Sequence, residues 1–140
     1  MRDTYNKTKV TRALSPTNGG NDTALVSQII DTLGYDSLLF AIATGSLADS
    51  NATFTVLVED GDSATLTDNA AVDDSQLLGT ESGASFTYAD DNKAIKIGYY
   101  GTKRYVRLTI TPSGNTGDDY ISALAIQGCA KTIPYTTQKG

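Results

Sequence analysis

The sequence predicts an all-β protein, an antiparallel β-sandwich of the jelly-roll type with extended N- and C-terminal arms. Two observations predict this fold. Roughly seven or eight short apolar runs, several of them alternating apolar and polar residues, follow one another at spacings of about 10–15 residues, which is typical of sandwiches. Clusters of Gly, Asn, Asp and Ser, which favour turns, separate the runs, and no stretch has the periodicity of a long helix.

Both ends of the chain have the composition of arms. Residues 15–22 are a run of turn-forming residues without apolar periodicity, and Pro16 biases the residue before it away from the helical conformation. The C-terminal end is similar and contains Pro134. We therefore expect an N-terminal arm over residues 1–23, a β-sandwich domain over residues 24–130 and a C-terminal tail over residues 131–140.

The first strands of the domain are expected over residues 25–30, 38–44 and 53–59. Residues 38–44 are apolar on both faces, which is typical of a strand covered on both sides or of a short buried helix. The flanking Gly34 and Gly45 favour the strand. In the third strand, period-two alternation places one set of side chains on the inner face: Phe54, Val56 and Val58.

The middle of the chain carries weaker signals. Residues 63–68 are expected to form a strand that holds Leu66, and residues 84–88 a second short strand. Between them, Asp73 can cap one or two helical turns and Gly79 can end them.

The last part of the domain alternates clearly. Strands are expected over residues 94–100, 104–111 and 120–129. Pro112 is expected to end the second of these, because proline has no N–H to donate to a ladder. Cys129 falls in the last strand, where we expect a buried thiol. The inner face of the second strand is expected to carry Val106, Leu108 and Ile110.

The composition excludes most catalytic chemistry. The chain of 140 residues has no His, no Trp and a single Cys, which excludes His-dependent nucleophilic catalysis, the common zinc sites and a disulfide within the chain. Pairs of Asp in the predicted turns offer oxygen ligands for Ca²⁺ or a carboxylate pair for glycoside hydrolysis, but turn formation explains them more simply. We expect a protein that is not an enzyme and has no cofactor or metal.

The charge is unevenly distributed. The net charge is −5, and a nucleic-acid partner is not expected for such an acidic chain. Residues 1–12 nevertheless carry four cations against Asp3 alone, and residues 131–140 add two cations and no acid. These ends either keep the termini solvated or contact an acidic surface, for example a neighbouring copy. The N-terminal candidates for such contacts are Arg2, Lys7, Lys9 and Arg12.

A second group of cations stands beside tyrosines. Lys103, Arg104 and Tyr105 follow a Gly-Thr turn. Such a hairpin can bind phosphate or a stacked base, or its cations can simply offset the surrounding acids. Because Tyr and Arg are enriched at protein interfaces, a protein partner is the better functional interpretation. No apolar run is long enough to cross a bilayer and no secretory signal is evident, so we expect synthesis in a cytoplasm and no membrane partner.

Several segments resemble, in order, small tailed-phage proteins that are encoded beside the major capsid protein. The resemblance is carried by MRDTYNKTKV (1–10), GYDSLLF (34–40), FTVLVE (54–59), DSQLLGTE (74–81) and KIGYYGTKRYVR (96–107). It implies a virion structural protein, specifically a capsid cement or decoration protein. Such a protein binds the outer surface of the head shell across junctions between capsid subunits and stabilises the shell. The implied partners are the major capsid protein and further copies of the chain, with a homotrimer expected before a dimer.

Two other functions stay open. Residues 105–110 also resemble a strand of discoidin-like carbohydrate-binding sandwiches, which implies a module that binds host glycans from the virion exterior. Its stacking candidates are Tyr99, Tyr100 and Tyr105, although the absence of Trp argues against it. The third function is that of a head–tail connector component, which differs from a cement protein in its low copy number.

Overall fold

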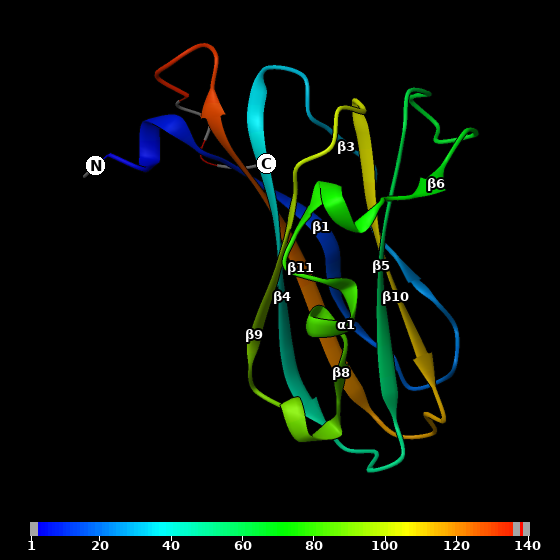
Figure 1. Cartoon of the computed structure of the whole chain (residues 1–140). Helices are drawn as coiled ribbons and strands as arrows, with labels where there is room; N and C mark the ends of the chain where they lie inside the picture. Colours follow the sequence, from blue (N-terminus) through cyan, green and yellow to red (C-terminus); the bar gives the residue numbers. More distant parts are fainter. Residues whose placement is uncertain (1–2, 136–137, 139–140) are drawn as a thin grey trace.

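Two antiparallel β-sheets pack face to face in the computed structural model, which describes residues 3–135 and 138 (Figure 1). The first sheet has the strand order β1-β11-β4-β9-β7, and the second has the order β2-β10-β5-β6, with β3 beside β10 and β8 beside β5. The predicted β-sandwich is therefore confirmed. The strands of the first sheet are β1 (Lys9–Asn18), β4 (Tyr35–Leu47), β7 (Leu77–Leu78), β9 (Ala94–Tyr99) and β11 (Asp119–Ala130). Those of the second are β2 (Leu25–Val26), β3 (Ile30–Asp31), β5 (Thr53–Gly61), β6 (Ala70–Ala71), β8 (Phe86–Thr87) and β10 (Tyr105–Ser113).

The helical elements are short. They are η1 (Tyr5–Lys7), η2 (Asp74–Gln76), η3 (Tyr88–Asp90) and α1 (Glu81–Ala84). Asp73 caps η2 as predicted, since its side chain accepts the N–H of Ser75. Among the residues that the structure describes, no helix has the length and apolar character needed to cross a membrane.

The core lies between the two sheets and follows the predicted alternation. Along β10, the inward side chains of Val106, Leu108 and Ile110 are fully buried, and they face the interior together with those of β5. In β5, Phe54 stacks on Phe86, with ring centroids 4.8 Å apart. Non-directional burial of these apolar side chains is the main stabilising contribution to such a fold.

The N-terminal segment differs from the expected arm. Residues 9–18 form β1, which pairs antiparallel with β11 at the edge of the first sheet. Ala13 and Leu14 are both buried, because a register shift between Arg12 and Leu14 turns two consecutive side chains inward. This bulge removes the period-two pattern by which strands are detected. Pro16 is tolerated because one side of an edge strand needs no ladder partner.

The two chain ends meet at one end of the sandwich. Tyr135 donates its backbone N–H to the carbonyl of Asn6 (2.8 Å), and its ring lies edge-to-face against Tyr35 at 6.0 Å. Lys131 likewise donates its N–H to the carbonyl of Gly34 (2.9 Å). The described part of the predicted tail thus follows the surface near η1, as Figure 1 shows.

Pro112 does not end its strand. It lies within β10 opposite Phe54 and is buried. Leu108, four residues earlier, directs its N–H and carbonyl toward Ser27, on the side of β2. By alternation Pro112 faces the same side, where β2 pairs only with Thr109 and Ile110, so the missing N–H costs no ladder bond.

Two further expectations were wrong. Leu66 is buried but sits in a turn with a left-handed backbone (φ 51°), where Asp68 accepts the N–H groups of Asp62 and Ser63. These hydrogen bonds favour the turn over the predicted strand and hold the pKa of the Asp68 carboxyl below its usual value. Cys129 is exposed, because its left-handed backbone (φ 52°) breaks the alternation at the end of β11.

Candidate functional site

The cations of the segment between β9 and β10 face acids of the same chain. The Arg104 guanidinium donates two hydrogen bonds to Asp31, Nε–Oδ1 at 2.9 Å and Nη2–Oδ2 at 2.8 Å, and lies 5.0 Å from the centroid of the Tyr105 ring. The Lys103 ammonium forms an ion pair with Asp62. These contacts lower the pKa of Asp31 and raise that of Lys103. The predicted partner-binding group Lys103, Arg104 and Tyr105 is brought together, but its positive charge is balanced within the chain.

The neighbouring Arg107 is held in the same way. Its guanidinium donates to Glu59 Oε2 from Nε at 3.1 Å and from Nη2 at 2.7 Å. Both side chains are partly buried. This outer surface of the second sheet therefore presents paired charges rather than free cations.

The N-terminal cations have a different environment. Lys7 ends η1, Lys9 and Arg12 lie on β1, and Arg2 lies outside the described residues. Within residues 3–135 and 138, none of Lys7, Lys9 and Arg12 has a carboxylate within salt-bridge distance. The Lys9 ammonium instead lies 5.9 Å from the centroid of the Tyr35 ring. Positive charge at this edge of the first sheet is therefore available to a partner.

The outer surface of the first sheet carries an apolar row that crosses all five strands and is exposed at its two ends and partly exposed at Ile126 and Leu39 between them. Val10 of β1 lies opposite Ile126, Ile126 opposite Leu39, and Leu39 opposite Gly98, which in turn pairs with Leu78 of β7. Val10 is 48% exposed and Leu78 is 62% exposed. At Gly98 an added Cβ would lie 2.9 Å from the Leu78 side chain, so glycine allows Leu78 to lie over the strand.

A second row beside it ends in a cation at each edge. Arg12 of β1 lies opposite Leu124, Leu124 opposite Ala41, and Ala41 opposite Lys96 of β9. Leu124 is 44% exposed, and among the described residues Lys96 has no acidic partner within salt-bridge distance. We call the two rows together the apolar face: Val10, Leu39, Leu78, Leu124 and Ile126, with Arg12 and Lys96 at its margins.

Shallow hollows border the apolar face on both sides. One of about 410 Å³ is lined by residues that include Leu39, Leu78 and Lys96. Another of about 400 Å³ is lined by residues that include Val10 and Tyr5. An exposed apolar surface with polar margins and adjoining hollows is typical of a protein–protein contact rather than of a small-molecule pocket.

Sequence reasoning did not identify the apolar face, although one signal pointed to it. Residues 38–44 are apolar on both faces, which predicts that both faces are covered. In the structure the inward side chains of Phe40 and Ile42 are fully buried, while Leu39 and Ala41 point to the other side and stay partly exposed, because the described part of the chain forms no third layer there. Because residues 1–23 were expected to form an arm, Val10 and Arg12 were not placed in a sheet. In the structure Val10 ends the first row and Arg12 ends the second.

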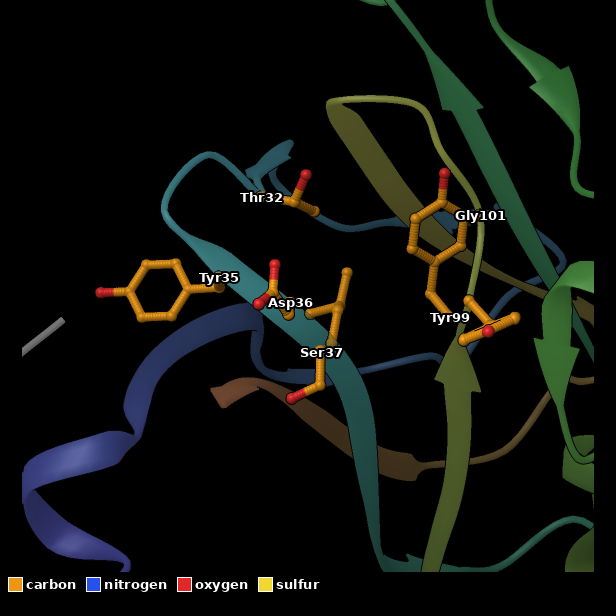
Figure 2. Close-up of a pocket in the computed structure, with 8 residues that line it drawn as sticks. Thr32, Tyr35, Asp36, Ser37, Tyr99 and Gly101 are labelled. Carbon is orange, nitrogen blue, oxygen red and sulfur yellow. The ribbon is translucent and has the colours of Figure 1, made fainter. Parts of the chain in front are cut away.

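A separate hollow of about 120 Å³ lies at the end of the sandwich near η1, lined in part by Thr32, Asp36 and Ser37 (Figure 2). Tyr99 lines it but is buried, donating its hydroxyl to Asp60 at 2.7 Å, and burial beside that carboxylate raises the pKa of Tyr99 above its usual value. The neighbouring Tyr100 is 71% exposed. Of the three tyrosines considered for sugar stacking, Tyr99 is thus unavailable and Tyr105 is partly covered by Arg104.

Several aspartates of the predicted turns accept hydrogen bonds that hold the loops in place. Asp73 caps η2, Asp90 completes a capping box with Thr87, and Asp118 accepts the side-chain N–H of Asn18 at 2.6 Å. Residues 3–135 and 138 contain no group of three or more His, Cys, Asp or Glu side chains close enough to hold a metal.

Comparison with known proteins relates the chain to solved structures only. No protein-family model and no curated protein matches the sequence. The structure is similar to the PBSX exported protein XepA, with a TM-score of 0.57 and 12% identity over 94% of this chain and 40% of that one. The chain thus spans two-fifths of the length of XepA. At this identity the likeness shows that the two share a β-sandwich fold.

Two further solved structures are similar to a lesser degree. The SPBc2 prophage-derived protein YomS has a TM-score of 0.48 and 12% identity over 85% of this chain and 92% of that one. A chain of the cyanophage Pam1 capsid asymmetric unit has a TM-score of 0.49 and 14% identity over 86% of this chain and 84% of that one.

Proposed function

We propose that this protein is a bacteriophage virion structural protein that binds the outer surface of the head shell across junctions between capsid subunits and stabilises it as a cement protein. The apolar face carries the proposal, because it is a partly exposed apolar surface whose marginal cations, Arg12 and Lys96, have no acidic partner among the described residues. The resemblance of five segments to phage proteins encoded beside the major capsid protein supports it. The fold shared with the PBSX exported protein XepA is compatible with it.

Burial of the apolar face against a capsid surface would contribute favourable free energy to docking. Complete burial of a fully exposed Val, Leu or Ile side chain contributes about 1.5–3 kcal/mol. Side chains of the apolar face are already partly buried, so each contributes a fraction of that before the entropy lost on binding is subtracted. Copies bound on a symmetric lattice reinforce one another through effective concentration. A protein that binds only the assembled shell stabilises it by mass action.

Charge orients the bound protein. Arg12 and Lys96 flank the apolar face, and Lys7 and Lys9 lie at or near the β1 edge. Arg2 precedes them in the sequence, outside the described residues. The remainder of the chain is strongly acidic, so an acidic capsid surface attracts this side and repels the other. The major capsid protein is thus proposed to present an apolar patch with carboxylates around it. Lys103, Arg104 and Tyr105, paired within the chain, take a minor part.

Self-association completes the proposal. Capsid sites have local symmetry, and a decoration protein that occupies them gains from contacts between its copies. We propose a homotrimer first and a dimer second, on the exterior of the virion, with synthesis in the host cytoplasm. Multi-angle light scattering of the free protein and of protein released from particles distinguishes the two states.

A binding experiment with matched charge variants tests the apolar face. Head shells prepared without this protein are mixed with wild-type, R12Q/K96Q, L124S and K103Q/R104Q protein and sedimented. We expect the first two variants to bind at least about tenfold more weakly, and K103Q/R104Q, which loses the same charge, to bind like wild type. Weakened binding of K103Q/R104Q alone would instead place the contact at the β9–β10 segment and overturn the assignment.

A glycan-binding module is the second candidate function. The observation that favours it is Tyr100, which is exposed beside the polar hollow of Figure 2. In this case wild-type protein would bind glycans in an array and Y100A would not, while L124S would bind as well as wild type. Absence of any glycan signal at high protein concentration leaves the cement function as the better account.

A further inference from the structure

The buried carboxylate of Asp119 lacks a hydrogen-bond partner within residues 3–135 and 138. Asp119 begins β11, is 0% exposed, and neither of its side-chain oxygens has a hydrogen-bond partner among the described residues. Burial of a carboxylate without a partner is strongly unfavourable, so such a group is normally matched by a proton, a water or a cation. This carboxylate belongs to none of the surfaces described above.

Three loops close around this end of the sandwich, away from the chain termini (Figure 1). The first follows β1: Gly19 donates its N–H to the Asp119 carbonyl (2.6 Å), and Asn18 Oδ1 accepts the Asp119 N–H (3.0 Å). The loop before β11 joins the first loop where Asn115 donates its N–H to Asp22 (2.8 Å). It joins the loop after β4 where Thr116 donates its N–H to Asp49 (2.8 Å).

These loops are rich in oxygen and contain no balancing cation. Residues 18–23, 47–52 and 113–119 together hold Asp22, Asp49, Asp118 and Asp119 but no Lys or Arg. The side-chain oxygens of Asn18 and Asn115 each accept a single backbone N–H, which leaves each a lone pair for a cation. Asn115 is itself buried.

We propose that Asp119 is the anionic ligand of a Ca²⁺ site that ties the three loops together, with the amide oxygens of Asn18 and Asn115 and backbone carbonyls as further ligands. Ca²⁺ fits this donor set because it takes six to eight oxygen ligands in irregular geometry, whereas Mg²⁺ demands a strict octahedron and Zn²⁺ prefers N and S ligands. One carboxylate provides little charge, so we expect weak affinity, with a dissociation constant of about 10⁻⁴–10⁻³ M.

Thermal unfolding with and without Ca²⁺ tests the site. After treatment with EDTA, wild-type protein is titrated with CaCl₂ and, separately, with MgCl₂ or with NaCl at equal ionic strength. Ca²⁺ at about 100 times its dissociation constant is expected to raise the Tm by roughly 10 °C, and the other salts by much less. Isothermal titration calorimetry of the wild type gives the stoichiometry, for which we expect one ion per chain.

Variants identify the ligand. D119N is expected to lose the Ca²⁺ response, whereas D91N, which removes the same charge from an exposed turn, is expected to keep it. If D119N does not fold, N115A, which removes only a neutral ligand, serves in its place and is expected to weaken binding. A wild-type Tm that Ca²⁺ does not change, or a D119N protein that is more stable than wild type and equally insensitive to Ca²⁺, shows that Asp119 holds no Ca²⁺ and overturns the proposal.

Discussion

Pairing within the chain determines which charged side chains stabilise this protein and which are free to bind a partner. Glu59 is held by Arg107 through two hydrogen bonds in a partly buried position, whereas the ion pair of Lys103 with Asp62 is exposed. Charge-assisted hydrogen bonds in protected positions contribute far more than exposed ion pairs. The protected ion pair of Arg107 with Glu59 thus lies in the second sheet. Arg12 and Lys96, which have no acidic partner among the described residues, lie on the first.

We expect R107Q to lower the free energy of unfolding by about 1.5–3 kcal/mol, because it leaves Glu59 partly buried and short of donors. K103Q, the matched control at an exposed pair, is expected to cost less than about 1 kcal/mol. Urea denaturation measures both. Equal costs for the two variants would show that burial at Glu59 does not strengthen its interaction.

Tyr99 confers a pH dependence on stability. Its pKa is raised by burial and by Asp60, so above pH 10, the ordinary value, the unfolded chain loses the tyrosine proton first. The stabilising effect of the neutral hydroxyl is therefore complete below pH 10 and declines as the pH rises above it. Thermal melts between about pH 8 and 11 are expected to show a steeper alkaline loss of stability in wild type than in Y99F. Parallel curves for the two proteins contradict this assignment.

At the scale of elements, β1 differs from the other long strands in that the sequence did not predict it. β5, β9, β10 and β11 were predictable because their inward apolar residues alternate along most of each strand. β1 was not, since its bulge buries Ala13 and Leu14 in succession and Pro16 follows. The candidate site was predictable only in part. Lys9 and Arg12 were named from the charge pattern of the sequence. The apolar rows beside them were not found, because they depend on the register between strands that lie far apart in the sequence.

Truncation tests whether residues 9–18 stabilise the domain as an edge strand or are a dispensable arm. Deletion of residues 1–18 removes the β11 partner and the buried Leu14, so we expect it to lower the free energy of unfolding by at least about 3 kcal/mol. Deletion of residues 1–4, which ends before η1, is the control and is expected to change stability little. Circular dichroism melts report both. A chain without residues 1–18 that melts like wild type contradicts the role of β1 in the sheet.

At the scale of the whole molecule, the outer surfaces of the two sheets differ in character. The second sheet pairs its charges within the chain, and the first presents the apolar face with free cations at its margins. An otherwise acidic body gives the molecule a polarity that sets which side meets the shell. The proposed Ca²⁺ site lies at the end of the sandwich far from η1 and would stiffen the loops there without altering the apolar face.

The copy number of this protein relative to the major capsid protein in purified particles tests the central proposal most directly. Quantitative mass spectrometry or densitometry of stained gels gives this ratio. A cement protein that occupies repeated shell sites is expected in numbers comparable to the capsid subunits. A number matching a single ring at the head–tail junction, or absence from the particles, contradicts the proposed function.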